Sequence, residues 1–216
     1  MKYLCENIQG CVLGYTQSDE ITLILVDYQK LTSDAWFDYE VQKMCSIAAS
    51  MATMAFNKYF AQNIEKSLYD YGEEEIYYSH RIAIEKGAMF DARCFNVPKE
   101  EVTNLIYWRQ IDAARNSVQM VGRAYFSHKE LDHKKINMIQ DMLFTQKGIN
   151  WNDYPTHQKR GSCCIKETYY LEPKEGFEEC PVNAGSARTR WVIDTNIPMF
   201  KGEDRDYIDK LIYVGE

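Results

Sequence analysis

The chain has 216 residues, 45% of them hydrophobic and 13% aromatic, which is enough to bury the core of one large domain or two small ones. Its formal net charge of −7 argues against a protein that coats nucleic acid through many lysine and arginine contacts, although a local basic patch is compatible with it. No apolar run approaches the ~20 residues of a membrane span, and the N-terminus lacks the apolar stretch of a signal peptide.

The cysteine pattern predicts reduced thiols. The seven cysteines are odd in number and follow no framework spacing. Two of them, Cys163 and Cys164, are neighbours, and a disulfide between neighbours would be strained. We therefore expect a cytoplasmic protein without a disulfide framework.

The first elements in chain order are a helix and two strands. Residues 1–9 have helical character without a capping residue before them. Residues 11–16 and 20–26 are rich in Thr, Val, Ile and Tyr, which favour strands. The polar residues between these strands predict a tight turn.

A long amphipathic helix is predicted over residues 34–62, because apolar side chains recur every three or four positions and Asp34 can serve as its N-cap. The opposite stripe is small and polar with a single cation. Such a stripe either lines a site or is simply solvated. It consists of Lys43, Ser46, Ser50, Thr53 and Asn57.

The next stretch predicts less regular structure, followed by strands. Residues 63–79 are acidic and predict a loop with a short helix, and residues 80–85 predict a strand. Residues 88–97, bounded by Gly87 and Pro98, predict a second and clearer strand.

The second half predicts helices followed by a hairpin. A long helix is expected from Pro98 to about residue 127, and another over residues 132–146 with Gly148 as its end. The alternating residues of 164–172 and 187–195 predict two paired strands.

The long helix from Pro98 has two stripes. Its core stripe is predicted to be Tyr107, Ile111, Ala114, Val118, Val121 and Tyr125, and its polar stripe Arg109, Asp112, Asn116, Gln119 and Arg123. The order of elements predicts an α+β fold. We expect one domain over residues 1–97, with a helical and C-terminal hairpin region over 98–216 packed on it; the alternative is a single continuous domain.

Asp19 and Glu20 lie at the junction of the first two predicted strands. Acidic residues are common in turns, so a purely structural turn is one interpretation. The other is a Mg²⁺ site, because Mg²⁺ binds one or two carboxylates together with phosphates and water. In a palm-type polymerase, phosphoryl transfer uses two metal ions about 4 Å apart and needs a further carboxylate from a neighbouring strand. No such carboxylate precedes Asp19 in the sequence.

Four ordered segments carry a family resemblance: "YTQSDEITLIL" (15–25), "MFDARCFNVP" (89–98), "YWRQIDAARN" (107–116) and "LFTQKGINWNDYPTHQKRG" (143–161). Together they resemble the tRNA(His) guanylyltransferase family, and most closely its bacterial and archaeal Thg1-like branch. The resemblance implies a polymerase-palm-like antiparallel sheet and addition of nucleotides to the 5′ end of tRNA in the 3′–5′ direction. It further implies tRNA maturation or repair, ATP and GTP as substrates, two Mg²⁺ ions and a homotetramer.

The resemblance also implies roles for individual residues. Asp19 and Glu20 match catalytic carboxylates, with Asp19 as a metal ligand. The expected nucleotide-binding residues are Ser18, Lys43, Ser46 and Arg93, and the expected tRNA-binding residues are Arg109, Gln110, Asn116, His157, Lys159 and Arg160. Glu40 stands where some members have arginine, and Ala114 where eukaryotic members often have histidine. The second departure favours the repair branch.

The family's first strand, which carries the other metal aspartate, has no counterpart before Met1 in this sequence. We therefore expect the sheet to have an unpaired edge and these 216 residues alone to have little nucleotidyl transfer activity. The alternative function is a tRNA- or nucleotide-binding fragment that is catalytically incomplete. A nucleotide cyclase, which shares the palm topology, is a third possibility, although the "WRQ" helix and the basic loop argue against it.

Overall fold

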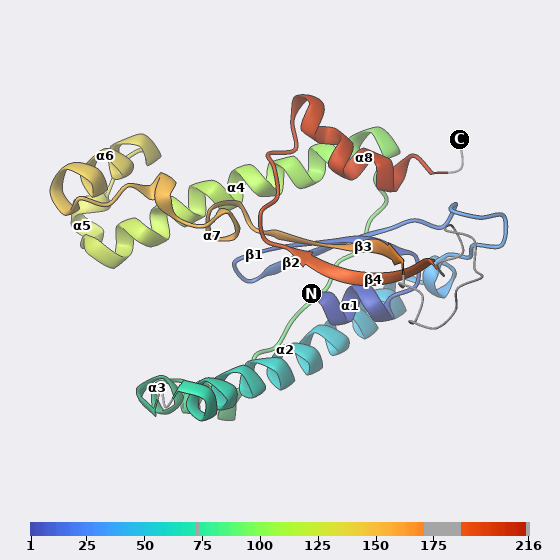
Figure 1. Cartoon of the computed structure of the whole chain (residues 1–216), viewed down its shortest axis with the longest axis horizontal. Helices are drawn as coiled ribbons and strands as arrows, with labels where there is room; N and C mark the ends of the chain where they lie inside the picture. The colour runs from blue at the N-terminus through green and yellow to red at the C-terminus, as the bar shows by residue number, and fades with distance from the viewer. Residues whose placement is uncertain (72–73, 171–186, 215–216) are drawn as a thin grey trace, which may run out of the picture.

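The computed structural model describes residues 1–71, 74–170 and 187–214 (Figure 1). Its helical elements in chain order are α1 (Lys2–Asn7), η1 (Trp36–Tyr39), α2 (Val41–Tyr71), α3 (Glu74–Lys86), α4 (Lys99–Tyr125), α5 (His128–Leu131), α6 (Ile136–Lys147), η2 (Trp151–Asp153), α7 (Thr156–Arg160), η3 (Gly202–Arg205) and α8 (Asp206–Ile212). Its strands are β1 (Cys11–Gln17), β2 (Glu20–Leu25), β3 (Ser162–Tyr170) and β4 (Ala187–Asp194). In the part of the chain that the structure describes, no helix combines the length and apolarity needed to cross a membrane.

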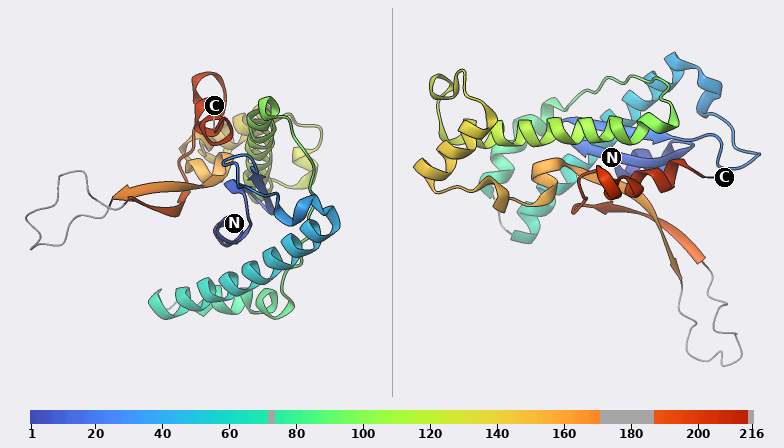
Figure 2. Two further views of the ribbon diagram at one scale, coloured as in Figure 1. Left: turned by 90° about the vertical axis from the view of Figure 1, so that its right-hand side faces the viewer. Right: turned by 90° about the horizontal axis from the view of Figure 1, so that it is seen from above.

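One antiparallel sheet organises the chain, with strand order β2-β1-β3-β4. It takes strands from both sides of position 97, because β1 pairs with β3 through Leu13↔Ile165 and the following residues. Only the first four residues of β3, 162–165, pair with β1, so the rest of the β3–β4 hairpin extends beyond the sheet (Figure 2). The α+β architecture expected from the sequence is confirmed.

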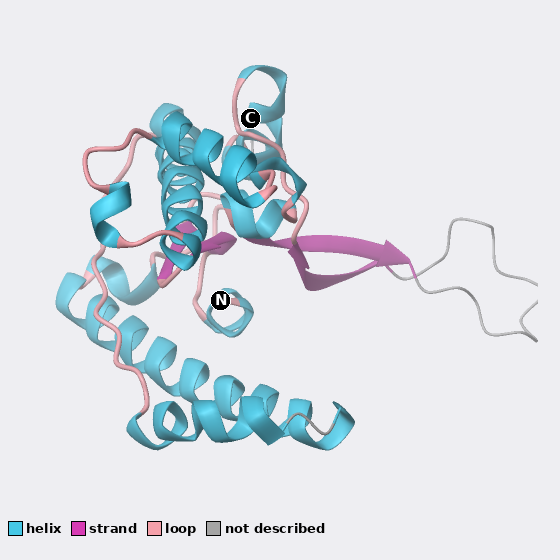
Figure 3. Cartoon of the chain, turned by 90° about the vertical axis from the view of Figure 1, so that its left-hand side faces the viewer, coloured by secondary structure: helices cyan, strands magenta, loops and turns pink. Residues whose placement is uncertain are grey.

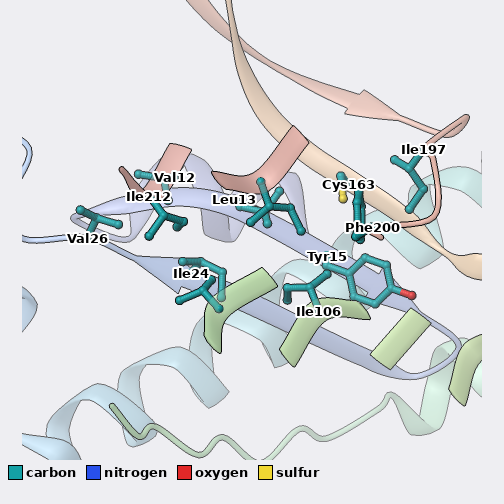
Figure 4. Packing of buried hydrophobic residues seen from close by; sticks show 12 residues of the cluster. Val12, Leu13, Tyr15, Ile24, Val26, Ile106, Cys163, Ile197, Phe200 and Ile212 are labelled. Carbon is teal, nitrogen blue, oxygen red and sulfur yellow. The ribbon is translucent and has the colours of Figure 1, made fainter. Parts of the chain in front are cut away.

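Helices cover both faces of the sheet (Figures 1 and 3). On one face, α4 and α8 pack on β1 and β2 through Ile106 and Ile212, next to Leu13 and Ile24 (Figure 4). On the other face, α1 packs so closely that a Cβ on Gly14 would lie 2.4 Å from the Cys5 sulfur. Burial of these apolar side chains is the main stabilising contribution to the layered arrangement.

A second apolar cluster lies at the far end of α4, where α5 and α6 fold back on it. Its buried members are Val118, Phe126, Ile139 and Leu143. Gly148 ends α6 with φ of 69°, as the sequence predicts. The helix predicted over 132–146 is α6, which begins four residues later than predicted, at Ile136. The short α5 before it was not predicted; Ser127 and Glu130 form the capping box that begins it.

The start of the predicted helix 34–62 is wrong, because residues 34–40 lie outside α2. Phe37, Asp38 and Tyr39 have φ values of 52°, 50° and 62°, a left-handed turn that helical periodicity cannot reveal. Asp34 therefore caps nothing, and α2 begins at Val41. The helix also continues to Tyr71, well beyond the predicted end, into residues 63–79, which were predicted as a loop with a short helix.

Both strands predicted between 80 and 97 are also wrong. Residues 80–85 lie inside α3, which packs against α2. Residues 88–97 are extended but pair with no strand among the described residues. The backbone groups of Ala88 and Phe90 bond to side chains of α2 instead. The strand-like sequence of this segment therefore pairs with a helix and not with another strand.

The long helix α4 begins after Pro98 as predicted, but its buried stripe is displaced from the predicted one. Of the predicted stripe only Val118 is fully buried. The buried residues of α4 are Val102, Thr103, Ile106, Gln110, Ala113, Val118 and Gly122. The buried stripe differs because α4 packs on the sheet near its N-terminal end and on α6 near its C-terminal end, so different faces of the helix are buried along its length.

Gln110 fixes the C-terminal segment to the core. It is 0% exposed, its Nε2 donates to the Pro198 carbonyl at 2.7 Å, and its Oε1 accepts from the Phe200 amide at 3.0 Å. We expect Gln110→Ala to lower the free energy of unfolding by about 2–4 kcal/mol, because it leaves a cavity and two buried backbone groups without partners.

Urea denaturation of the two proteins measures this difference. Gln119→Ala on the same helix is the matched control, since Gln119 is only half-buried and should change stability by less than about 1 kcal/mol. Equal effects of the two substitutions would contradict the role of Gln110.

Candidate functional site

The turn between β1 and β2 is short and rigid. Gln17 pairs with Glu20, so Ser18 and Asp19 alone form the turn, and Ser18 has φ of 50°. The Thr16 hydroxyl donates to the Glu20 carbonyl at 2.8 Å and braces the turn from inside. Ser18 and Asp19 are exposed at its tip.

The two adjacent carboxylates have different surroundings. Arg109 of α4 lies 2.8 Å from Glu20 Oε2, and the Gln17 amide donates to the same oxygen at 3.0 Å. Within residues 1–71, 74–170 and 187–214, no side chain or backbone group bonds to the Asp19 carboxylate. Glu20 is therefore partly neutralised, and Asp19 is left with its full charge toward solvent.

The basic segment around α7 is joined to the same end of β1. The buried Tyr15 hydroxyl donates to the Arg160 carbonyl at 2.7 Å. Burial is the main cause that raises the pKa of Tyr15, so the phenol keeps the proton that it donates. Gly161, with φ of 83°, passes so close that a Cβ there would lie 2.4 Å from the Thr16 carbonyl oxygen.

The side chains of α7 and the α4 polar stripe border this turn. His157 is exposed, while Lys159 donates to the Asn152 carbonyl at 2.5 Å and lies over the Trp151 ring. On α4, Asn116 donates to Asp112 at 3.2 Å. Arg109 contacts Glu20 and the Arg160 carbonyl is bonded to Tyr15, so α4 and α7 both bring basic residues to the end of β1 that carries the acidic turn. Their role in tRNA binding stays a prediction.

Gln110 departs from its predicted role. Because its side chain is fully buried and both ends of its amide are bonded to residues 198 and 200, no atom of it can reach a tRNA in this structure. It acts on the site indirectly, by fixing the helix that carries Arg109.

Of the four predicted nucleotide-binding residues, Ser18 lies on the β1–β2 turn. The other three, Lys43, Ser46 and Arg93, lie on or beside the start of α2. Lys43 lies over the Phe37 ring at 4.5 Å, the Ser46 hydroxyl donates to the Lys43 carbonyl at 3.1 Å, and Arg93 contacts Asp91 at 3.4 Å. The whole length of β2 separates this end of the sheet from the β1–β2 turn (Figure 1). The structure therefore does not bring Lys43, Ser46 and Arg93 next to Asp19.

The remainder of the polar stripe of α2 has a structural role that the sequence did not reveal. Asn57 donates to the Ala88 carbonyl at 2.9 Å and accepts from the Ala88 amide at 2.7 Å. Thr53 accepts from the Phe90 amide at 3.1 Å. Gly87, with φ of 66°, lets the chain turn so that Ala88 reaches α2. In the sequence, the only indication of this contact was the spacing of small polar residues three or four apart along α2.

The described residues do not supply a complete metal site. No group of three or more His, Cys, Asp or Glu side chains within them is arranged to hold an ion. Asp19 offers one free carboxylate, which is fewer donors than a metal ion needs without phosphates or water.

Comparison with known proteins decides the family. The family described as tRNAHis guanylyltransferase matches residues 1–98. A solved bacterial tRNA(His) guanylyltransferase (Thg1)-like protein in complex with ATP is 38% identical, with a TM-score of 0.74, and the match covers 99% of this chain and 76% of that one. The chain belongs to the tRNA(His) guanylyltransferase family. The resemblance carried by the four sequence segments is thereby confirmed.

Further relatives support the assignment to the tRNA(His) guanylyltransferase family. A bacterial Thg1-like protein in complex with GTP is 35% identical at a TM-score of 0.69, covering 99% of this chain and 74% of that one. Uncharacterized protein R259 of Acanthamoeba polyphaga mimivirus is 30% identical over 170 residues, 73% of this chain and 56% of its own length. A probable tRNA(His) guanylyltransferase of Dictyostelium discoideum is 25% identical over 187 residues, 80% of this chain and 64% of its own length. The chain thus spans between 56% and 64% of these two curated relatives.

The contact of α2 with residues 88–90 yields a prediction for this family member. Thr53→Val and Asn57→Leu keep the side-chain size but remove the bonds to the Ala88 and Phe90 backbone. We expect hydrogen exchange at these two amides to accelerate at least about tenfold, because each loses its acceptor. Mass spectrometry of peptides spanning 86–92 measures the rates.

Ser50→Ala is the control, because the Ser50 hydroxyl bonds only to the Ser46 carbonyl within α2. Unchanged exchange in the Asn57→Leu protein would show that the extended segment is held by something other than α2.

Proposed function

We propose that the chain is the part of a tRNA nucleotidyltransferase that carries the β1–β2 turn, and that the enzyme adds nucleotides to the 5′ end of tRNA in the 3′–5′ direction. The observation that carries the proposal is the Asp19 carboxylate without a partner among the described residues, on a rigid turn. Arg109 of α4 is bonded to the neighbouring Glu20, and α7 is joined to the same end of β1 through the Arg160 carbonyl. The proposal's support from relatives is the likeness, over 99% of this chain, to Thg1-like proteins whose complexes contain ATP and GTP.

The charge distribution suits a local tRNA contact. With a net charge of −7, the chain as a whole repels phosphates, so affinity must come from a concentrated basic surface. Arg109, His157, Lys159 and Arg160 provide one next to the turn. In the proposed complex they contact the tRNA backbone and hold the 5′ end near Asp19, which fixes position without reading sequence.

The proposed chemistry is a phosphoryl transfer. ATP or GTP first activates the 5′ phosphate of the tRNA. The 3′ hydroxyl of an incoming nucleoside triphosphate then attacks that phosphorus, so a new phosphodiester bond forms and the activating group leaves. Mg²⁺, when bound, would offset the negative charge of the phosphates. Asp19 would contact such an ion, because its carboxylate has no partner among the described residues, whereas Glu20 is bonded to Arg109.

The residues at the start of α2 belong to the proposal as a separate phosphate-binding region. Lys43, Ser46 and Arg93 are exposed there, and cations with small hydroxyls accommodate phosphate oxygens. A homotetramer, a cytoplasmic location and a role in tRNA maturation or repair complete the proposal, all by analogy with the family.

A second candidate function is binding without transfer. It is favoured by the single free carboxylate at the turn and by the lack of a metal-holding cluster within the described residues. In that case the chain would bind tRNA and nucleotide but would not join them. Addition of labelled GTP to a 5′-truncated tRNA distinguishes the two functions: transfer supports the first, and tRNA binding without transfer supports the second.

Asp19 should matter for nucleotide binding and not for stability. We expect Asp19→Asn to weaken Mg²⁺-dependent GTP binding at least about tenfold, because the neutral amide is a poorer ligand for a hard cation. Its melting temperature should stay unchanged, since the side chain has no partner within the described residues.

Isothermal titration with GTP and MgCl₂ gives the affinity. Asp204→Asn, at an exposed carboxylate in η3, is the control and should bind GTP as the unaltered chain does. Equal affinity of the two variants would count against the site.

The basic residues of α7 should carry tRNA affinity. We expect the triple variant His157→Ala, Lys159→Ala, Arg160→Ala to bind tRNA at least about tenfold more weakly and with a shallower salt dependence, because it loses phosphate contacts. Filter binding at several salt concentrations measures both quantities.

A second triple variant, which also removes three basic side chains, is available around α5. Lys129→Ala, Lys134→Ala and Lys135→Ala lie around α5, and all three residues are exposed. If this control lost more tRNA affinity than the α7 variant, the result would contradict the proposed site and indicate that tRNA binds around α5.

A further inference from the structure

Two thiols face each other between α2 and the extended segment 88–97. Cys45, in the second turn of α2, donates its thiol proton to the Cys94 sulfur, and the two sulfur atoms are 3.6 Å apart. Both residues are half-buried and free, whereas Cys5, Cys11, Cys163 and Cys164 are buried. The Cys45–Cys94 pair is thus the thiol pair of the described residues that a dissolved reagent can reach.

The backbone around Cys94 is able to move by the small amount that a bond requires. Segment 88–97 pairs with no strand among the described residues, and α2 holds it at Ala88 and Phe90. Near Cys94 the neighbouring side chains are open to solvent, with Arg93 87% and Phe95 69% exposed. Shortening the contact to the ~2.05 Å of a disulfide needs a shift of roughly 1.5 Å.

We propose that Cys45 and Cys94 form a modification site for low-molecular-weight disulfides such as oxidised glutathione, which convert the pair into an intramolecular disulfide. One cysteine thiolate attacks a sulfur of the oxidised glutathione and displaces one glutathione thiolate. The second cysteine thiolate then attacks the mixed disulfide at the cysteine sulfur and displaces the other. One protein disulfide forms, one glutathione disulfide is reduced to two thiols, and the two cysteine protons pass to solvent or to those thiols.

The disulfide would attach the segment to α2 at a second place. Asn57 and Thr53 hold Ala88 and Phe90, and the new bond would hold residue 94 between them and Val97, which packs on the core. The cross-link joins residues 49 positions apart, a span at which loop closure restricts the unfolded chain substantially. Arg93 would be immobilised beside the start of α2. This inference does not depend on the proposed nucleotidyltransferase activity.

The pair differs from the other thiols in access more than in proximity. Cys5, Cys11 and Cys164 lie together under α1, with exposed fractions of 2%, 4% and 0%. A thiolate can attack a dissolved disulfide only if its sulfur atom is accessible to that reagent. Oxidation of the folded chain should therefore link Cys45 to Cys94 and leave the buried cluster reduced.

The test is oxidation of the full chain with oxidised glutathione, followed by peptide mapping without reduction. Burial and the contact with Cys45 raise the pKa of Cys94, so the reaction is run at about pH 8.5, where more thiolate is present. We expect a Cys45–Cys94 cross-linked peptide, slower hydrogen exchange in residues 91–97, and a melting temperature raised by at least about 5 °C, each reversed by dithiothreitol.

Cys45→Ser and Cys94→Ser provide the controls and should each show no shift on oxidation. Cys180 lies outside the described residues, so Cys180→Ser is treated in parallel and should behave as the unaltered chain does. Absence of the Cys45–Cys94 peptide, or a disulfide within the buried cluster instead, would overturn the proposal. A cross-link that leaves exchange in 91–97 and the melting temperature unchanged would overturn the fixing of the segment.

Discussion

The joint between β1 and the chain entering β3 is the contact on which the site depends. Tyr15 and Arg160 are 145 positions apart in sequence, yet the buried phenol donates to the arginine carbonyl and Gly161 lies against Thr16. This joint sets the basic side chains of α7 beside the acidic turn. Without it, the two features would be unrelated charge clusters on a chain that is acidic overall.

The same arrangement explains why two adjacent carboxylates differ. Side chains of neighbouring residues leave a tight turn in different directions, and only Glu20 meets α4. The Glu20–Arg109 pair is about half exposed, so its contribution to stability is at most ~1 kcal/mol. Its main consequence is that the Glu20 carboxylate is held against α4, whereas the Asp19 carboxylate points to solvent, where an external ligand can reach it.

Helix α2 shows how a polar stripe can be divided between roles. Its first part presents Lys43 and Ser46 to solvent, while Thr53 and Asn57 further along hold the extended segment that leads toward α4. The segment thus links the two helices that flank the sheet on opposite faces. Movement of the segment would affect Arg93 directly and the start of α4 through Pro98.

The sequence by itself determined the local elements whose signals are local. The two N-terminal strands, the start of α4 at Pro98, the end of α6 at Gly148 and the C-terminal hairpin follow from alternation, proline and glycine. The family motifs likewise located Asp19, Arg109 and the basic loop. Tertiary structure decided what these signals cannot contain: the left-handed turn at 37–39, the helical state of 80–85, the burial of Gln110 and the pairing of residues 88–90 with side chains instead of a strand. The burial of Gln110, the helix at 80–85 against α2 and the contacts of residues 88–90 depend on partners distant in sequence, and a buried polar group or an extended backbone adopts whichever state that partner satisfies. The left-handed turn is a backbone conformation that side-chain periodicity does not encode.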